Sequence, residues 1–135
     1  MELQVGVKVL LKNPKGKYLV IRRAHDKYQE VQQKWDIPGG RINADSALLK
    51  NLMREVSEET GLEMTSTPKL IAAQDIFNNQ QERHIVRLTY VGTAEGEPCL
   101  SEEHTEHKWV MLAELRTLGN LDRYLKELLD NGTIS

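Results

Sequence analysis

Three glutamates stand within five positions in the segment "REVSEETGLEM", residues 54–64. On a helix, Glu55, Glu58 and Glu59 would share one face, because residues three and four apart lie above one another. Like charges at this spacing repel by roughly 0.3 kcal/mol per pair. An ordinary solvated acidic face would explain two such residues. The third carboxylate lies beside the apolar stripe of the same helix, where burial makes its charge more costly.

A bound cation would neutralise this cluster. Arg54 precedes Glu58 by four residues and can compensate only part of the negative charge. Mg²⁺ takes oxygen ligands, often from a few carboxylates, and leaves positions for water and substrate phosphates. The spacing therefore predicts a divalent metal site on one helix face.

A glycine pair precedes the helix in the segment "IPGGR". Gly39 or Gly40 can bring the main chain close to a ligand and offer a carbonyl oxygen to a metal. Alone, the pair would equally fit an ordinary turn. Its position just ahead of the acidic helix favours a shared site.

The helix that must position the glutamates is expected over residues 47–60. Asp45 or Ser46 is placed to cap its start, and Gly61 to end it. Its apolar residues recur at helical spacing, namely Leu48, Leu49, Leu52, Met53 and Val56.

The remaining elements are mostly strands. "LQVGVKVLL" and "KYLVIRR" are expected to form a hairpin across the turn "KNPKGK", followed by a loop with a short strand near Trp35. "KLIAAQDIF" and "RHIVRLTYVGTA" predict a second antiparallel pair, and "HKWVML" a further strand. Residues 112–129 predict one helix, or two around Gly119. Together these elements indicate a mixed α/β domain.

Length and charge limit the protein class. The chain has 135 residues with 39% hydrophobic content, which fits one domain over residues 1–135. Its 18 basic and 20 acidic residues give a net charge of -2, which argues against a protein that grips nucleic acid through its overall field. Cys99 is the only cysteine, so no intrachain disulfide is expected. Without a leader or an apolar span, we expect a soluble cytoplasmic protein.

The segment resembles the Nudix box, the signature of the Nudix hydrolase family. The residues that stand at its spacing are Gly40, Arg54, Glu55, Val56, Glu58, Glu59, Gly61 and Leu62. The flanking segments "WDIPGGR" and "EEHTEHKWVMLAEL" extend the resemblance over nearly the whole chain. The resemblance implies an α/β/α sandwich with a mixed β-sheet. It also implies Mg²⁺ or Mn²⁺ as cofactor and hydrolysis of a nucleoside diphosphate linked to another group.

The resemblance also assigns roles. Glu55, Glu58 and Glu59 match the carboxylates that bind metal or activate water, and the carbonyl of Gly40, or of Gly39, matches a backbone ligand. Arg54 matches a supporting arginine that holds the glutamates by salt bridge. One position departs, because the box usually has glutamate where this chain has Ser46. That glutamate mostly supports the loop and helix, so its loss bears on rate and metal affinity rather than on reaction type.

A further carboxylate is expected from "SEEHTEHKW". An acidic loop exposed to solvent is the plain interpretation of its glutamates. Nudix enzymes often place a catalytic or metal-binding glutamate several residues ahead of a tryptophan like Trp109. This likeness favours Glu103, with Glu106 as the alternative unless it pairs with a neighbour on its strand.

The sequence signals for substrate-binding residues are less specific than those for the metal site. Arg22 and Arg23 could meet phosphates, and Trp35, Phe77 or Tyr28 could stack on a base, although solvated arginines and core aromatics are the ordinary alternatives. Phe77 and Asn78 stand where ADP-ribose hydrolases tend to carry a proline, which disfavours that substrate.

From this resemblance we expect a nucleoside triphosphate pyrophosphohydrolase, an enzyme that releases a nucleoside monophosphate and pyrophosphate. The general base among the glutamates stays open. A Nudix-fold nucleotide-sensing or interaction domain without hydrolysis is the alternative, and an RNA decapping enzyme is a third class that the net charge disfavours. The expected partner is a small nucleotide, with no membrane and no polymeric nucleic acid, and a homodimer stays open.

Overall fold

The computed structural model describes residues 1–23, 33–102 and 104–135. Its elements follow the order β1 (Glu2–Lys12), β2 (Tyr18–Arg23), β3 (Trp35–Asp36), β4 (Gly39–Arg41), α1 (Leu48–Thr60), β5 (Lys69–Asn78), β6 (Arg83–Thr93), β7 (His104–Val110), α2 (Leu112–Thr117) and α3 (Arg123–Asp130). Within these ranges, no helix is both long enough and apolar enough to cross a bilayer.

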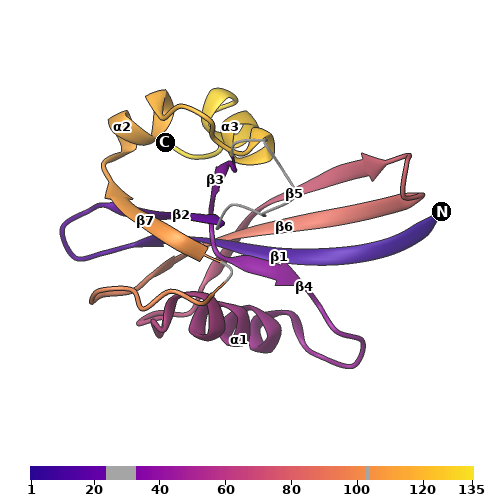
Figure 1. The fold of residues 1–135 in the computed structure, drawn as a ribbon, viewed down its shortest axis with the longest axis horizontal. Coiled ribbons are helices and arrows are strands. Elements are labelled where there is room, and N and C mark those ends of the chain that lie inside the picture. The colour runs from indigo at the N-terminus through magenta and orange to yellow at the C-terminus, as the bar shows by residue number, and fades with distance from the viewer. Residues whose placement is uncertain (24–32, 103) are drawn as a thin grey trace.

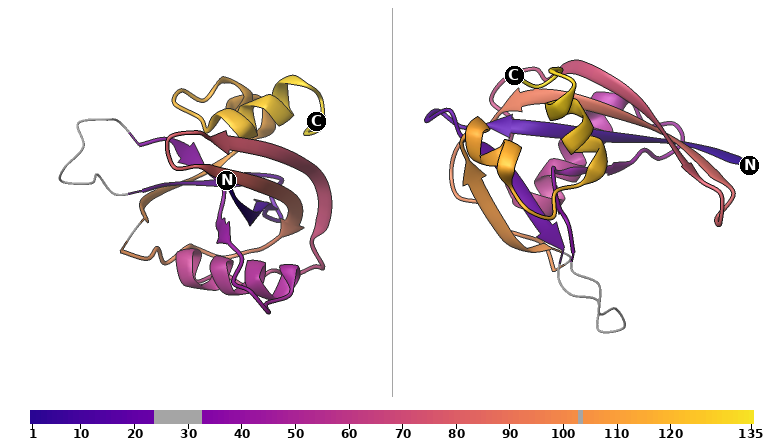
Figure 2. Two further views of the ribbon diagram at one scale, coloured as in Figure 1. Left: turned by 90° about the vertical axis from the view of Figure 1, so that its right-hand side faces the viewer. Right: turned by 90° about the horizontal axis from the view of Figure 1, so that it is seen from above.

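The sheet lies between two helical layers (Figure 1), which confirms the predicted α/β/α sandwich. Figure 2 shows α2 and α3 over one face of the sheet and α1 across the other. Side chains alternate between the two faces, as a strand requires. In β1, Val7 and Val9 pack in the core cluster that contains Leu52 of α1, whereas Leu10 packs in the cluster that contains Leu125 of α3.

The sheet divides at one edge of β1. On its other edge, β1 runs parallel to β6 along its whole length, from Glu2 opposite Arg83 to Lys12 opposite Thr93. The predicted hairpin of β1 with β2 forms only beside its turn, where Lys12 pairs with Tyr18. Beyond that point β2 pairs with β7 and β3, and β4 takes its place beside β1. The two strands separate because residues 35–41 lie between them.

Helix α1 confirms the predicted helix, and Gly61 ends it in the left-handed conformation. The predicted cap was wrong. Ala47 occupies the N-cap position without a side-chain hydrogen bond, and Asp45 has a left-handed backbone with φ 69°. The expected loop "PGGR" also contains the short strand β4, which sequence alone did not indicate because its partner is distant β1.

The later elements agree with expectation. Strands β5 and β6 form the predicted antiparallel pair. The strand "HKWVML" begins earlier, at His104, and ends before Met111. The C-terminal apolar run forms two helices, and the break between them carries the left-handed Asn120.

Gly39 generates the first testable prediction. Its φ is 145°, and a Cβ atom there would lie 2.0 Å from the carbonyl oxygen of Val7 and 2.8 Å from the Cα atom of Lys8. Gly39→Ala should lower the free energy of unfolding by about 2 to 4 kcal/mol, through strain and overpacking. Gly119→Ala is the matched control, because no atom of the described residues lies within 4 Å of its added methyl group. Chemical denaturation of both variants checks the difference, and equal stabilities would contradict the close approach of β4 to β1.

Candidate functional site

One row of α1 side chains faces β4. Asn51, Glu55 and Glu59 follow one another at intervals of four residues, so they line one face of the helix. The Oε2 atom of Glu59 accepts a hydrogen bond of 2.9 Å from the backbone N–H of Gly39. Gly40 packs on the next carboxylate, since a Cβ atom there would lie 2.9 Å from the Cδ atom of Glu55. The glycine strand and the glutamates therefore form one site.

Arg54 lies among the side chains of this row. Its guanidinium donates to Glu55 at 3.2 Å and to Glu58 at 3.4 Å. It also donates to the Oδ1 atom of Asn51 at 3.1 Å. The side chain of Glu55 is 17% exposed, whereas that of Glu58 is 59% exposed. Only part of the predicted acidic cluster is therefore buried against the sheet.

Glu59 has the most perturbed carboxyl group of the row. The pKa of Glu59 is raised to about 7, mainly by burial and to a smaller extent by the neighbouring charges of Glu55 and Asp36. The hydrogen bond from Gly39 and the charge of Lys8 lower the pKa, but less than burial raises it. The charged form of this carboxyl is therefore unfavourable without an added positive charge.

The chemistry of this row fits a hard divalent cation. Across the described ranges, no three His, Cys, Asp or Glu side chains come close enough to hold a metal ion among themselves. Mg²⁺ does not require such a cage, because it commonly binds through one or two carboxylates together with water and phosphates. Glu55 and Glu59 supply partly buried carboxylates of this kind, and the Gly40 backbone lies beside them.

The row opens into a cleft of about 1100 Å³. At one end the cleft is lined by Gly40, Glu55, Glu58, Glu59 and Glu102. Its other lining residues include Lys8, Asp36, Ile76, Ile85, Arg87 and Asp122. The cleft therefore joins an acidic region to one of mixed charge.

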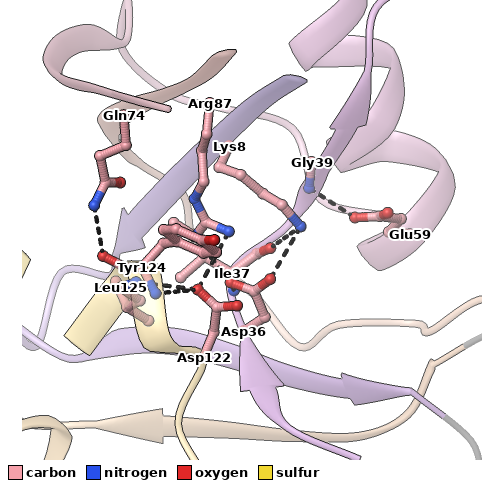
Figure 3. A network of polar contacts seen from close by, with 10 residues as sticks. All are labelled: Lys8, Asp36, Ile37, Gly39, Glu59, Gln74, Arg87, Asp122, Tyr124 and Leu125. Atoms are coloured by element: carbon pink, nitrogen blue, oxygen red, sulfur yellow. Dashed lines mark hydrogen bonds and ion pairs between the residues drawn. The ribbon is translucent and has the colours of Figure 1, made fainter. Parts of the chain in front are cut away.

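The region of mixed charge is centred on Arg87, which is only 5% exposed. Its guanidinium contacts Asp36 at 3.1 Å and Asp122 at 3.3 Å. The ammonium of Lys8 lies 3.3 Å from Asp36 and donates to the carbonyl oxygen of Ile37 at 3.2 Å. Figure 3 shows this network beside the Gly39–Glu59 contact. A buried arginine with two carboxylate partners avoids the cost of an unpaired charge.

The same network keeps Asp36 ionised. Burial alone would raise the pKa of Asp36, but the charges of Lys8 and Arg87 and the hydrogen bonds from Arg87 and the Ile37 N–H hold that pKa below its usual value. Asp122 has a second role, because its side chain caps α3 by accepting from the N–H groups of Tyr124 and Leu125. Asp36 therefore differs from Glu59, whose pKa is raised because its charge is not matched to the same extent.

Several predicted substrate residues do not come together at the cleft. Trp35 is buried, and the Arg22 guanidinium and the Lys108 ammonium lie over its ring at 4.4 and 5.3 Å from the centroid. Phe77 is exposed and stacks on His84, with ring centroids 4.5 Å apart. None of these side chains is among the described residues that line the cleft, whereas the predicted Arg23 is.

The acidic loop contributes two described residues to the cleft, Ser101 and Glu102. Glu103 and Tyr28, which the sequence also singled out, lie outside the described residues. Glu106 pairs with Arg22 on the neighbouring strand β2 at 2.5 Å. That contact agrees with the alternative that Glu106 pairs with a neighbour, although the partner lies on the adjacent strand and not on β7 itself.

Sequence reasoning missed Lys8, Asp36, Arg87, Asp122 and Asn51. One signal was available for Arg87, because in "RHIVRLTYV" it occupies an inward position between Ile85 and Thr89. A charge in such an alternating strand indicates a buried partner. Asn51 carried a weaker signal, a polar residue on the otherwise apolar edge of the helix.

Comparison with known proteins identifies relatives of this architecture. The family model described as "NUDIX domain" matches residues 2–131. The structure of the MutT protein from Methanosarcina mazei Go1 is 29% identical, with a TM-score of 0.82, and the match covers 96% of this chain and 92% of that one. The ORF135 protein of E. coli is 22% identical with a TM-score of 0.78, over 96% of this chain and 88% of that one, and shows the shared fold.

A curated relative matches over a shorter range. The m7GpppN-mRNA hydrolase NUDT17 of Danio rerio is 40% identical over 63 residues, which cover 47% of this chain and 21% of the relative. The match therefore spans about a fifth of that protein's length.

The raised pKa of Glu59 predicts a pH-dependent stability. The folded protein holds this proton more tightly than the unfolded chain, so without metal the free energy of unfolding falls as pH rises from about 4.5 through about 7. Glu59→Gln removes the titration and keeps an oxygen for the Gly39 N–H. In EDTA the variant should melt above the wild type at about pH 8, and this difference should disappear near pH 4.5. A difference in melting temperature that does not change with pH would contradict the assignment.

Proposed function

Because the chain belongs to the Nudix family, we propose that it hydrolyses a nucleoside diphosphate linked to another group, with Mg²⁺ or Mn²⁺ as cofactor. The family and the solved hydrolase structures support a hydrolase that acts on phosphoanhydride bonds. The substrate we favour is a nucleoside triphosphate, cleaved to a nucleoside monophosphate and pyrophosphate. The observation that carries this proposal is the acidic row of α1 at one end of a cleft. The rest of the cleft is lined by paired charges such as Arg87 and Asp36 and by apolar side chains such as Ile76.

The metal would be held at the acidic end. Glu55, Glu58 and Glu59 are its proposed side-chain ligands, together with the Gly40 backbone, and Arg54 supports the carboxylates. A bound divalent ion supplies positive charge to phosphate oxygens and lowers the pKa of a bound water. The raised pKa of Glu59 supports this role, because a carboxyl that is unfavourable when charged gains most from a neighbouring cation.

The chain's own residues would handle the proton. The oxygen of a water attacks a phosphorus of the phosphate bridge, the bond from that phosphorus to the bridging oxygen breaks, and pyrophosphate leaves. A carboxylate accepts the proton of the water. Glu55, Glu58 and Glu103 are the proposed candidates for this catalytic group. Glu102 lines the cleft directly before Glu103 in the chain, which supports a contribution from this loop.

The rest of the cleft would hold the nucleoside. Ile76 and Ile85 are cross-strand partners on β5 and β6 and give this part of the cleft an apolar wall. Arg87 and Lys8 form ion pairs with Asp36, so a neutral base can lie against these side chains without leaving an unpaired buried charge. Arg23 also lines the cleft and remains our candidate for a phosphate contact.

A decapping activity is the second candidate, because the Danio rerio relative is named as an mRNA hydrolase. The chemistry at phosphorus would be the same, but the partner would be a polymer. The net charge of -2 does not favour a phosphate backbone. A nucleotide-sensing domain without hydrolysis is disfavoured, since it has no need of a crowded acidic row with its arginine.

A substrate panel tests the proposal. Nucleoside triphosphates, dinucleoside polyphosphates, nucleotide sugars and a capped RNA are incubated with Mg²⁺ or Mn²⁺, and phosphate release is measured with and without added pyrophosphatase. We expect signal from a nucleoside triphosphate only when pyrophosphatase is present. Glu59→Gln, the control for contaminating activity, should reduce turnover roughly a hundredfold. Silence of the whole panel would support the sensing domain, and cleavage of the capped RNA alone would support decapping.

The catalytic role of Glu103 has its own test. Glu103→Gln should strongly reduce turnover at saturating Mg²⁺ and raised pH. Glu106→Gln is the matched control, because Glu106 is half exposed and pairs with Arg22, and surface ion pairs of this kind contribute little. Steady-state kinetics of the two variants decide between them. A large loss in the Glu106 variant with a normal Glu103 variant would reverse the assignment.

A further inference from the structure

Asn51 is a fully buried polar side chain at the junction of α1 and the glycine strand. Its Oδ1 atom accepts from the backbone N–H of Asn43 at 3.2 Å and from Arg54 at 3.1 Å. Its Nδ2 atom faces the carbonyl oxygen of Arg41 at 3.4 Å. Two donors on one end and an acceptor on the other fix the orientation of the amide. A single side chain thus joins the loop, the helix and the arginine of the acidic row.

Among the residues that the structure describes, the start of α1 has no other side-chain attachment of this kind. The N-cap Ala47 makes no capping hydrogen bond, and the Ser46 hydroxyl has no partner within residues 1–23, 33–102 and 104–135. A missing cap typically costs about 1 kcal/mol and leaves the first turn free to fray. The hydrogen bonds of Asn51, one turn into the helix, hold residues 41–43 against α1 instead.

The position of Asn51 in the row gives this attachment a consequence for the metal site. Moving along the helix, Asn51 meets the backbone of residues 41 and 43, Glu55 meets Gly40, and Glu59 meets Gly39. Both glutamates are among our proposed metal ligands, so their contacts with β4 must change when an ion competes for their oxygens. Asn51 has no charge, does not titrate and is fully buried, so its contacts persist with and without the ion.

We propose that Asn51 is a positioning residue that holds β4 and Arg54 in place, so that the Gly40 backbone and the carboxylates face one another before a metal binds. This inference rests on the proposed metal-dependent function. A side chain that only stabilised the fold would leave metal affinity unchanged in the folded protein. A positioning residue raises metal affinity, because the ion no longer has to order its own ligands.

The test compares two buried polar residues on the same helix. Asn51→Ala removes the attachment of the loop. Thr60→Val is the matched control, because Thr60 is also fully buried, but within the described part of the chain its hydroxyl bonds to Val56 and Leu62 alone, at the far end of α1. Both variants should lower the melting temperature in EDTA. Mn²⁺ binding is then measured from the electron paramagnetic resonance signal of the free ion, at a temperature where both variants are folded by circular dichroism.

We expect Asn51→Ala to raise the Kd for Mn²⁺ roughly tenfold, the usual effect of losing a residue that orients metal ligands. Thr60→Val should change the Kd less than about twofold, since the Thr60 hydroxyl bonds to Val56 and Leu62 and does not hold the glycine strand or Arg54. Asn51→Ser is included in case the alanine variant does not fold, and it should weaken binding in the same direction but less.

The outcomes separate the two proposals. Wild-type affinity in the folded Asn51 variants would overturn the positioning role and leave the proposed function standing. An equal loss of affinity in Thr60→Val would also overturn it, because the effect would then follow stability. A wild-type protein that binds no Mn²⁺ would instead overturn the proposed metal-dependent function, and the positioning role with it.

Discussion

The architecture of the site depends on how closely α1 approaches β4. A backbone N–H of Gly39 reaches a carboxylate of the helix, and Gly40 packs so closely on the next carboxylate that a Cβ atom would displace the end of the Glu55 side chain. Strand β4 pairs with the edge of β1 that β2 leaves free beyond the turn, so the separation of β1 and β2 and the position of β4 depend on each other. The division of the sheet, the glycine pair and the helix register are therefore parts of a single packing requirement.

Buried charges are paired in one part of the cleft and left without an equivalent partner in the other. Around Arg87, two acids and two bases lie in mutual contact, and the pKa of Asp36 stays low despite burial. Along α1, the carboxyl of Glu59 is buried without an equivalent partner, and its pKa rises. The first arrangement is stable by itself, because each buried charge has an opposite neighbour. The second becomes favourable only when a positive charge is added.

The acidic row could be predicted from sequence because it is local. Helical periodicity places Glu55, Glu58 and Glu59 on one face, and it needs no knowledge of the rest of the chain. The partners of that face could not be predicted in this way. Strand β4 depends on β1, and Arg87 depends on Asp36 and Asp122, which are distant in sequence. The N-cap prediction failed for the same reason. The start of α1 is attached through the hydrogen bonds of Asn51 to residues 41 and 43, and the path of that segment depends on the pairing of β4 with β1.

The pairing of β1 with β6 also bears on how the protein folds. The first strand of the chain has its full-length partner far along it, with Glu2 opposite Arg83, and the connection is parallel. Contacts of such high sequence separation form slowly, because a long loop must close before they contribute. Strand β4 pairs with the opposite edge of β1, so its support is complete only after β6 has docked. During synthesis, a ribosome-bound chain that ends before β6 would contain every residue of the acidic row. It would lack β6, the strand that pairs with β1 and so completes the sheet on which β4 depends.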